Sequence, residues 1–81
     1  MKVCVQFYAQ LSDLIGMRHL DLELSKGATV RDLLDEIYAR YPALRAHDKT
    51  ILLGAGVEFV DRNYALKQGD EIAIMPPVQG G

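Results

Sequence analysis

Residues 30–41 carry apolar side chains at the spacing of one helix face, and this pattern restricts the possible folds more than any other feature. In the segments on either side of it, apolar and polar residues alternate with a period of two. Thr29 is suited to cap a helix start, and Asp32 follows three residues later, near the positive helix end. The apolar positions recur at intervals of three and four, at Val30, Leu33, Leu34, Ile37, Tyr38 and Tyr41. Pro42 disfavours a helical conformation at Tyr41, so we expect the helix to end there and a polar connection to span 43–49. The stripe is typical of one helix packed on a sheet.

Period-two alternation predicts strands on both sides of this helix. The inward series are Val3, Val5 and Phe7; Leu20, Leu22 and Leu24; and Ile72 and Ile74. Residues 9–15 favour a short helical turn closed by Gly16. The apolar segment 50–60 is interrupted by Gly54 and Gly56, which indicates two short strand pieces around a bend or bulge. The order is therefore strand, strand, helix, strand pieces and strand.

This order, with a right-handed crossover, allows the first and last strands to lie parallel and adjacent beneath the helix. We therefore predict an α+β protein of the β-grasp class, with a mixed sheet of about four to five strands and one main helix on one face. A length of 81 residues allows one domain. We assign 1–75 to the β-grasp domain and 76–81 to an extended tail.

Charge and composition exclude several classes of function. The net charge is −2 and the basic residues are scattered singly, which argues against nucleic acid as a partner. No apolar run is long enough to span a membrane and no signal peptide is evident, so we expect a cytoplasmic protein. Cys4 is alone, so we expect no disulfide framework, and its place within the strand alternation favours a small packed residue. His19 and His47 are far apart, so we expect no metal site.

The C-terminal residues carry the strongest functional signal. Pro76 and Pro77 cannot continue a sheet ladder and favour a stiff, extended exit from the last strand. Val78 and Gln79 follow, and Gly80 and Gly81 have no side chains. Such a tip could enter a channel too narrow for a residue with a Cβ, and present a carboxylate at its end.

These residues resemble a known family. Met75-Pro76-Pro77-Val78-Gln79-Gly80-Gly81 is similar to the C-terminal signature of the small subunits of molybdopterin synthase, which are ubiquitin-like sulfur carriers. Phe7-Tyr8-Ala9-Gln10-Leu11 with Gly16, and the segment 66–73, resemble the opening of that family and its turn into the last strand. Gly56 stands where the family often has asparagine, and we expect a backbone turn there.

The resemblance implies a chemical cycle on the carboxylate of Gly81 and no catalytic side chain. An adenylating, E1-like enzyme uses ATP to activate this carboxylate, and a sulfur donor such as a cysteine desulfurase or a rhodanese-like protein then leaves a thiocarboxylate. The large subunit of molybdopterin synthase receives the tail, Pro76 to Gly81, and uses the sulfur to build the dithiolene of molybdopterin. The chain itself is then a carrier that binds no cofactor and no metal. One residue added after Gly81 should abolish this function.

Other functions remain open at this stage. The same tail chemistry could serve thiazole, cysteine or tRNA thiolation, or could join Gly81 to other proteins. A plain interaction module with a chemically inert tail is the third possibility. We expect Met75, Phe59, Tyr8 and Phe7 to form an apolar surface beside the root of the tail, where a protein partner docks.

Overall fold

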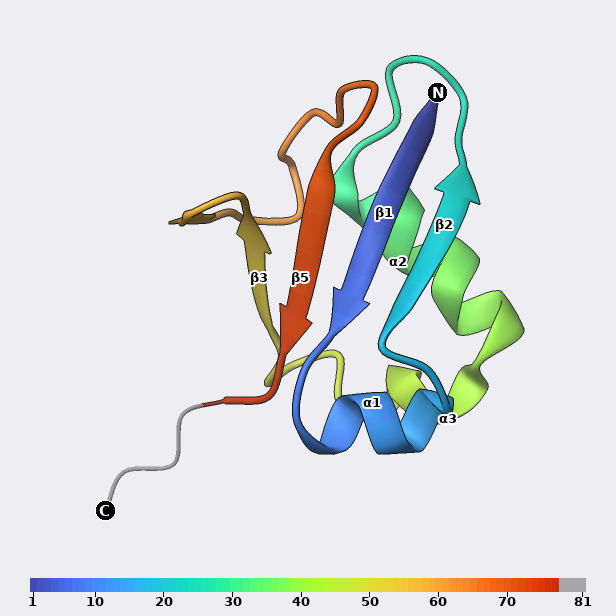
Figure 1. Ribbon diagram of the computed structural model, residues 1–81, viewed down its shortest axis with the longest axis vertical. Helices are drawn as coiled ribbons and strands as arrows, with labels where there is room; N and C mark the ends of the chain where they lie inside the picture. Colours follow the sequence, from blue (N-terminus) through green and yellow to red (C-terminus); the bar gives the residue numbers. More distant parts are fainter. Residues whose placement is uncertain (78–81) are drawn as a thin grey trace.

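The computed structural model describes residues 1–77, which form one five-stranded sheet and three helices (Figure 1). The elements, in chain order, are β1 (Lys2–Phe7), α1 (Gln10–Ile15), β2 (His19–Glu23), α2 (Val30–Arg40), α3 (Pro42–Arg45), β3 (Leu52–Ala55), β4 (Glu58–Phe59) and β5 (Glu71–Met75). The predicted tail boundary after residue 75 coincides with the end of β5, but the separate tail stays a prediction, because residues 78–81 lie outside the described part of the chain.

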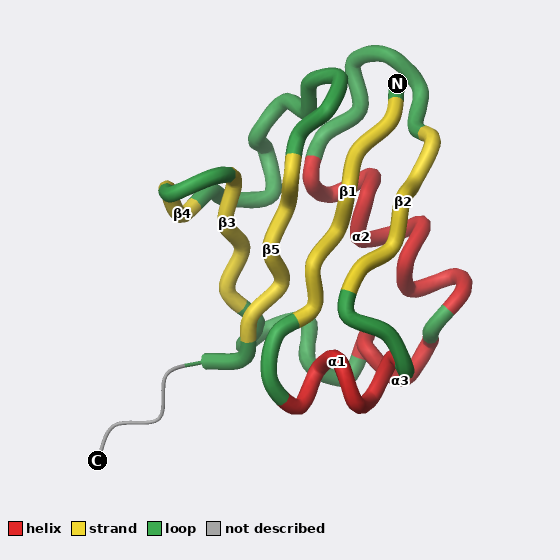
Figure 2. The backbone as a smooth tube through the Cα atoms, in the orientation of Figure 1, coloured by secondary structure: helices red, strands yellow, loops and turns green. Residues whose placement is uncertain are grey.

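The strands lie in the order β2-β1-β5-β3-β4. The first and last strands are parallel neighbours, with Val5 beside Ile72 and Phe7 beside Ile74, and the other pairs of strands are antiparallel. Helix α2 crosses one face of this sheet, while α1 and α3 lie at its lower end (Figure 2). The predicted mixed sheet with one main helix on one face, the β-grasp class, is therefore confirmed.

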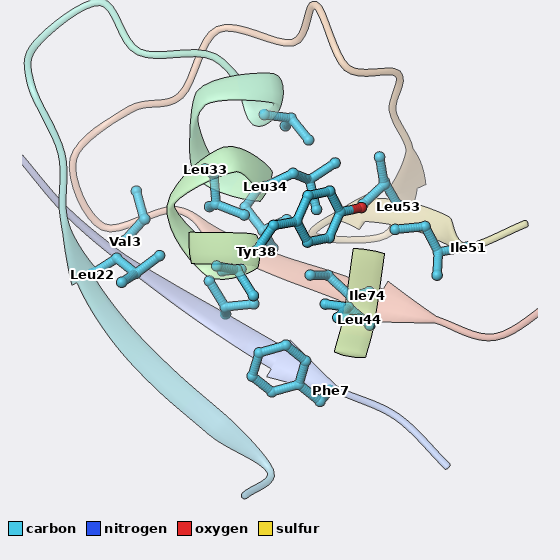
Figure 3. Close-up of a cluster of buried hydrophobic side chains, with 14 of the residues drawn as sticks. Val3, Phe7, Leu22, Leu33, Leu34, Tyr38, Leu44, Ile51, Leu53 and Ile74 are labelled. Carbon is cyan, nitrogen blue, oxygen red and sulfur yellow. The ribbon is translucent and has the colours of Figure 1, made fainter. Parts of the chain in front are cut away.

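The core lies between the sheet and α2, where the two periodicities meet (Figure 3). Every strand residue predicted to point inward from β1 and β5 is at most 4% exposed. The apolar stripe of α2 packs against these side chains, with Val30, Leu33, Leu34, Ile37 and Tyr38 all buried. Because successive residues of a strand point to opposite faces of the sheet, each strand contributes only half of its side chains to the core.

Helix α2 begins at Val30, directly after Thr29, as the sequence predicts. The Asp32 carboxylate accepts hydrogen bonds from the backbone N–H of Thr29 at 2.8 Å and from its hydroxyl at 3.2 Å. Tyr41 ends the helix, but the polar connection expected over 43–49 is wrong in its first part, since α3 spans Pro42–Arg45. Proline suits the first position of a helical turn, and α3 buries Leu44 completely in the core.

A polar cluster ties α2 to the segment that follows β4. The hydroxyl of Tyr38 donates to Oδ1 of Asp48 at 2.6 Å, and Nη2 of Arg62 lies 3.3 Å from the same oxygen. Arg62 also donates to the backbone carbonyl of Asp48. The hydrogen bond from Tyr38 holds the pKa of Asp48 below its ordinary value, with Arg62 acting in the same direction, while burial raises the pKa of Tyr38. The cluster thus anchors the return of the chain from the β3–β4 hairpin.

Candidate functional site

The tail begins where β5 loses its hydrogen-bonding partners. Met75 is the last paired residue of β5 and lies opposite Leu52 of β3. Pro76 and Pro77 follow outside the sheet, and neither has a backbone N–H to extend the ladder. Figure 1 shows the chain leaving the sheet at this lower end of β5. Val78, Gln79, Gly80 and Gly81, which we predict to enter a partner, lie outside the described residues.

Beside this exit, the face of the sheet opposite α2 carries a shallow groove of about 190 Å³. We call it the docking groove and define it by its lining residues, Tyr8, Gly54, Gly56, Val57, Glu58, Phe59, Ala73 and Met75. The pairing of the strands explains why these side chains meet: Gly54 of β3 lies between Ala73 of β5 and Phe59 of β4. The groove therefore joins three segments that are distant in the sequence: Tyr8, residues 54–59, and residues 73–75.

The docking groove contains three of the four side chains predicted to dock a partner. Phe59 is 73% exposed and Tyr8 is 46% exposed, while Met75 is half-buried beside the tail. Large apolar side chains with this exposure on one face are typical of an interaction surface. Tyr8, Phe59 and Met75 line one groove, and their use in docking stays a prediction.

Phe7 belongs to the other face of the sheet, and this corrects its placement in the docking group. Its ring is 4% exposed and packs in the core (Figure 3). The alternation of β1 explains the difference, because Phe7 follows Val3 and Val5 at intervals of two, whereas Tyr8 comes after the strand and points away from α2. Phe7 is therefore a core residue.

Gly54 is the groove residue whose role the sequence did not reveal. Its position suggested a bend, but Gly54 lies within β3, and the bend falls at Gly56, whose φ of 62° is in the left-handed region. A Cβ on Gly54 would lie 3.3 Å from Cε of Met75 and 3.5 Å from the backbone oxygen of Glu58. Because Gly54 has no side chain, the groove is deeper at this position than it would be with any other residue. Only its pairing with Phe59 and Ala73 identifies that role.

Cys4 lies on the same face as the groove, farther along the sheet, between Asp21 of β2 and Glu71 of β5. Burial raises the pKa of its thiol, and a hydrogen bond to Asp21 and the charge of Glu71 raise it further. The thiol is therefore uncharged at neutral pH and is a poor nucleophile. This environment agrees with its interpretation as a small packed residue of the strand.

The histidines and carboxylates of residues 1–77 do not form a metal-binding cluster. His19 and His47 are both exposed, and no three potential ligands among His, Cys, Asp and Glu come together in this part of the chain. The sequence contains two pairs of neighbouring carboxylates, 35–36 and 70–71, and one member of each has a structural partner. Glu36 pairs with Arg40 at 3.3 Å, and Asp70 accepts a hydrogen bond from the backbone N–H of Lys67 at 2.9 Å. The candidate functional features are the docking groove and the tail.

No helix within residues 1–77 is both long enough and apolar enough to cross a membrane.

Comparisons with known proteins agree with these features. The model of the ThiS family matches residues 5–81. A molybdopterin synthase sulfur carrier subunit from Chlamydomonas reinhardtii is 39% identical over 83 residues, and the match covers 100% of both chains. Small archaeal modifier protein 1 from Haloferax volcanii is 32% identical over 85 residues, covering 94% of this chain and 97% of the relative.

Solved structures show the same fold. The crystal structure of SAMP1 from Haloferax volcanii has a TM-score of 0.89 and 29% sequence identity, and the match covers 100% of both chains. A chain of the BexX/CysO complex from Amycolatopsis orientalis has a TM-score of 0.76 and 25% identity, covering 98% of this chain and 99% of that one. Similarity extends over the whole sheet, including the strand from which the tail emerges.

Proposed function

The chain belongs to the ThiS family, and we propose that it is the sulfur-carrier subunit of a molybdopterin synthase. The observation that carries this proposal is the full-length similarity to a molybdopterin synthase sulfur carrier, together with the motif Pro-Pro-Val-Gln-Gly-Gly directly after β5. The described body carries an apolar groove with exposed side chains beside the end of β5, which supports the role of a carrier that docks on another protein.

The proposed chemistry takes place on the carboxylate of Gly81. A carboxylate is a poor electrophile, so the activating enzyme joins it to the α-phosphate of ATP and releases pyrophosphate. A donor supplies sulfur at the level of sulfide, which displaces AMP and leaves a thiocarboxylate on Gly81. Its sulfur is ionised at neutral pH, and is therefore a good nucleophile.

The large subunit then provides the site in which this sulfur is used. The thiocarboxylate sulfur forms a carbon–sulfur bond to the pterin precursor while a carbon–oxygen bond of the precursor breaks and that oxygen leaves. Water then cleaves the acyl–sulfur bond, so that the carboxylate returns and the sulfur stays on the product. A dithiolene contains two sulfurs, so two loaded carriers are consumed for each molybdopterin. The stiff root at Pro76 and Pro77 and the side-chain-free Gly80 and Gly81 suit delivery into a narrow site.

The body of the protein has the matching role of docking. We propose that Tyr8, Phe59 and Met75 contact the protein that receives the tail, because they line the groove beside the tail root. The solved BexX/CysO complex, one chain of which shares this fold, supports binding of a second protein as the mode of action.

The experiment that tests the function is the intact mass of the protein isolated from its own cell. We expect a species in which one oxygen is replaced by sulfur, and fragmentation should place the sulfur on Gly81. Loaded protein mixed with the large subunit should convert the pterin precursor to molybdopterin. Sulfur transfer that survives deletion of Gly81 would contradict the carrier role.

A second candidate function is supported by the relative named small archaeal modifier protein 1. In that case Gly81 would be joined to an amino group of another protein instead of to sulfur. Trypsin digestion of cellular proteins distinguishes the two, because conjugation leaves a branched peptide derived from this tail on a lysine, whereas sulfur carriage leaves none.

A further inference from the structure

Strand β2 forms the one long free edge of the sheet among residues 1–77. The order of the strands places β2 at one end of the sheet and β4 at the other, and β4 spans only Glu58–Phe59 (Figure 2). Strand β2 is five residues long and pairs with β1 alone. Because the outer side of an edge strand carries a row of unpaired N–H and C=O groups, β2 can accept one further strand.

The hydrogen bonds between β1 and β2 show which residues of β2 face this edge. The N–H of Leu24 donates to the carbonyl of Met1 at 2.8 Å, and the amino group of Met1 donates to the carbonyl of Leu24 at 2.6 Å. In an antiparallel pair, residues bonded in this way alternate with residues whose backbone groups point away from the neighbour. The backbone groups of His19, Asp21 and Glu23 therefore point outward, where they offer a donor and an acceptor each.

The face of the sheet opposite α2 is acidic beside this edge. The side chains of His19, Asp21 and Glu23 lie on that face, and all three are exposed. Lys2 lies 3.6 Å from Asp21, whose side chain is still 60% exposed. The amino group of Met1 lies 3.8 Å from Glu23, whose side chain is 79% exposed. Since a carboxylate has two oxygens, both can accept a second cation, and lysine or arginine suits the neighbouring positions of an added strand.

The other face of the same edge, which points toward α2, is apolar. Leu20 and Leu24 are half-buried and pack against the margin of the core. Leu24 also lines a cavity of about 420 Å³ beside the end of β2, and Asp32 and Glu36 of α2 form its helix side. Alternate residues of an added strand point to this face, so aliphatic side chains there extend the apolar surface of Leu20 and Leu24.

The charges of the edge disfavour a second copy of this chain as the added strand. Symmetric antiparallel pairing of two copies about the centre of β2 places the Asp21 carboxylates of both copies opposite each other. A shift that pairs Asp21 with Glu23 again opposes two carboxylates. Like charges directly opposite each other destabilise a strand pair, whereas a basic strand gains from the same positions.

We propose that the free edge of β2 binds an extended segment of a second protein, in which lysine or arginine alternates with aliphatic residues. The segment forms backbone hydrogen bonds with the outward groups of His19, Asp21 and Glu23, and its cations lie beside the two carboxylates. Strand β1 separates β2 from β5, the strand that leads to the tail. The site is therefore distinct from the docking groove, and it can be occupied while the tail is engaged. This inference goes beyond the proposed function and does not depend on it.

A synthetic peptide, Lys-Val-Lys-Val-Lys-Val-Lys, is the probe that tests the proposal. On titration into isotope-labelled protein, we expect it to shift the amide resonances of residues 19–24 and to slow hydrogen exchange at the outward amides. The matched control, a peptide of equal length with glutamate in place of lysine, should bind at least about tenfold more weakly. Absence of binding, equal binding of both peptides, or shifts confined to another part of the protein would overturn the proposal.

Methylation of the peptide nitrogens tests the backbone contact without changing the protein. Methyl groups on the lysine nitrogens block an antiparallel added strand, and methyl groups on the valine nitrogens block a parallel one, because only one of the two sets of N–H groups faces β2. One methylated peptide should therefore lose at least about tenfold in affinity while the other retains it. Equal, unchanged affinity of both methylated peptides would show that no strand is added.

Neutralising the two carboxylates tests the charged contact. The double variant Asp21→Asn, Glu23→Gln should bind the lysine peptide about fivefold more weakly and show a flatter dependence on ionic strength. Glu58→Gln is the matched control, because Glu58 is an exposed carboxylate on β4 at the other edge of the sheet, and it should leave both quantities unchanged. A double variant that binds like the parent protein contradicts the pairing. Shifts at residues 19–23 that depend on protein concentration without peptide would identify a second copy as the occupant and overturn our choice.

Discussion

The two faces of the sheet differ sharply although they are built from the same strands. In β5, Ile74 is completely buried under α2, while its neighbour Met75 points to the opposite side and lines the docking groove. On the covered face, apolar side chains are packed by the helix and stabilise the fold. On the open face, apolar side chains gather at one end without a covering element among residues 1–77. One alternating strand therefore buries half of its side chains under the helix and leaves the other half on the open face, where we propose that they serve recognition.

The largest effect should come from the covered face. Ile74→Ala removes a completely buried side chain and leaves a cavity beside α2, so we expect a loss of about 2–5 kcal/mol in the free energy of unfolding. Urea denaturation measures this loss. Met75→Ala, one residue along the same strand, is the matched control and should cost much less. Equal losses for both variants would remove the distinction between the faces.

The polar cluster on the helix side should have a smaller effect. Asp48→Asn replaces the carboxylate that accepts the hydroxyl of Tyr38 and contacts Arg62, and we expect a loss of about 1–2 kcal/mol, since Asp48 is partly exposed. Comparison with Tyr38→Phe and with the double variant isolates the coupling between the two side chains. Additive effects would show that the hydrogen bond contributes nothing measurable.

The same cluster predicts a pH dependence. The pKa of Asp48 is lowered in the folded protein, so the ionised form is favoured by folding. Its contribution is therefore fully present above about pH 5 and is lost as the pH falls through the folded-state pKa. The difference in stability between the parent protein and Asp48→Asn should accordingly narrow in acid. A difference that grows in acid would contradict this sign.

Charge on the open face should affect binding more than stability. Met75→Asp should change the free energy of unfolding by less than about 1 kcal/mol, because the side chain lies at the edge of the groove and can reach water. Its affinity for a partner should fall, since a carboxylate then occupies the apolar wall. Ala39→Asp, on the exposed side of α2, is the control for an added charge. A variant that unfolds, or that binds as well as the parent, would contradict the docking role.

The smallest effect should come from Cys4, which lies on the open face away from the groove. Cys4→Ser should change stability by no more than about 0.5 kcal/mol. Because burial and the neighbouring Asp21 raise the pKa of the thiol, alkylation by iodoacetamide should be slow at neutral pH and should accelerate only above the ordinary titration range of a cysteine. Rapid alkylation at neutral pH would indicate a thiolate and would contradict the interpretation of Cys4 as a small packed residue.

Much of the fold follows from local patterns. The alternation of β1 and β5, the stripe of α2 and the cap at Thr29 are all where the sequence predicts them, because each depends on neighbours within a few residues. Pro42 predicts the end of α2, and in the structure it also begins α3. The burial of Leu44 could not be read from that segment, because the surface that covers it belongs to distant parts of the chain.

The candidate site likewise contains residues that the sequence identifies and residues that only the tertiary structure brings together. The sequence by itself indicates the proposed role of the tail, Pro76 to Gly81, because that proposal depends on the types of residue in it and not on packing. It also determined that Met75 faces away from the core, because parity along a strand is a local property. Only the tertiary structure decided that Tyr8, Gly54 and Phe59 meet beside Met75, and that Phe7 does not. The physical reason is strand pairing: the register between β3, β4 and β5 brings together residues that no local pattern connects.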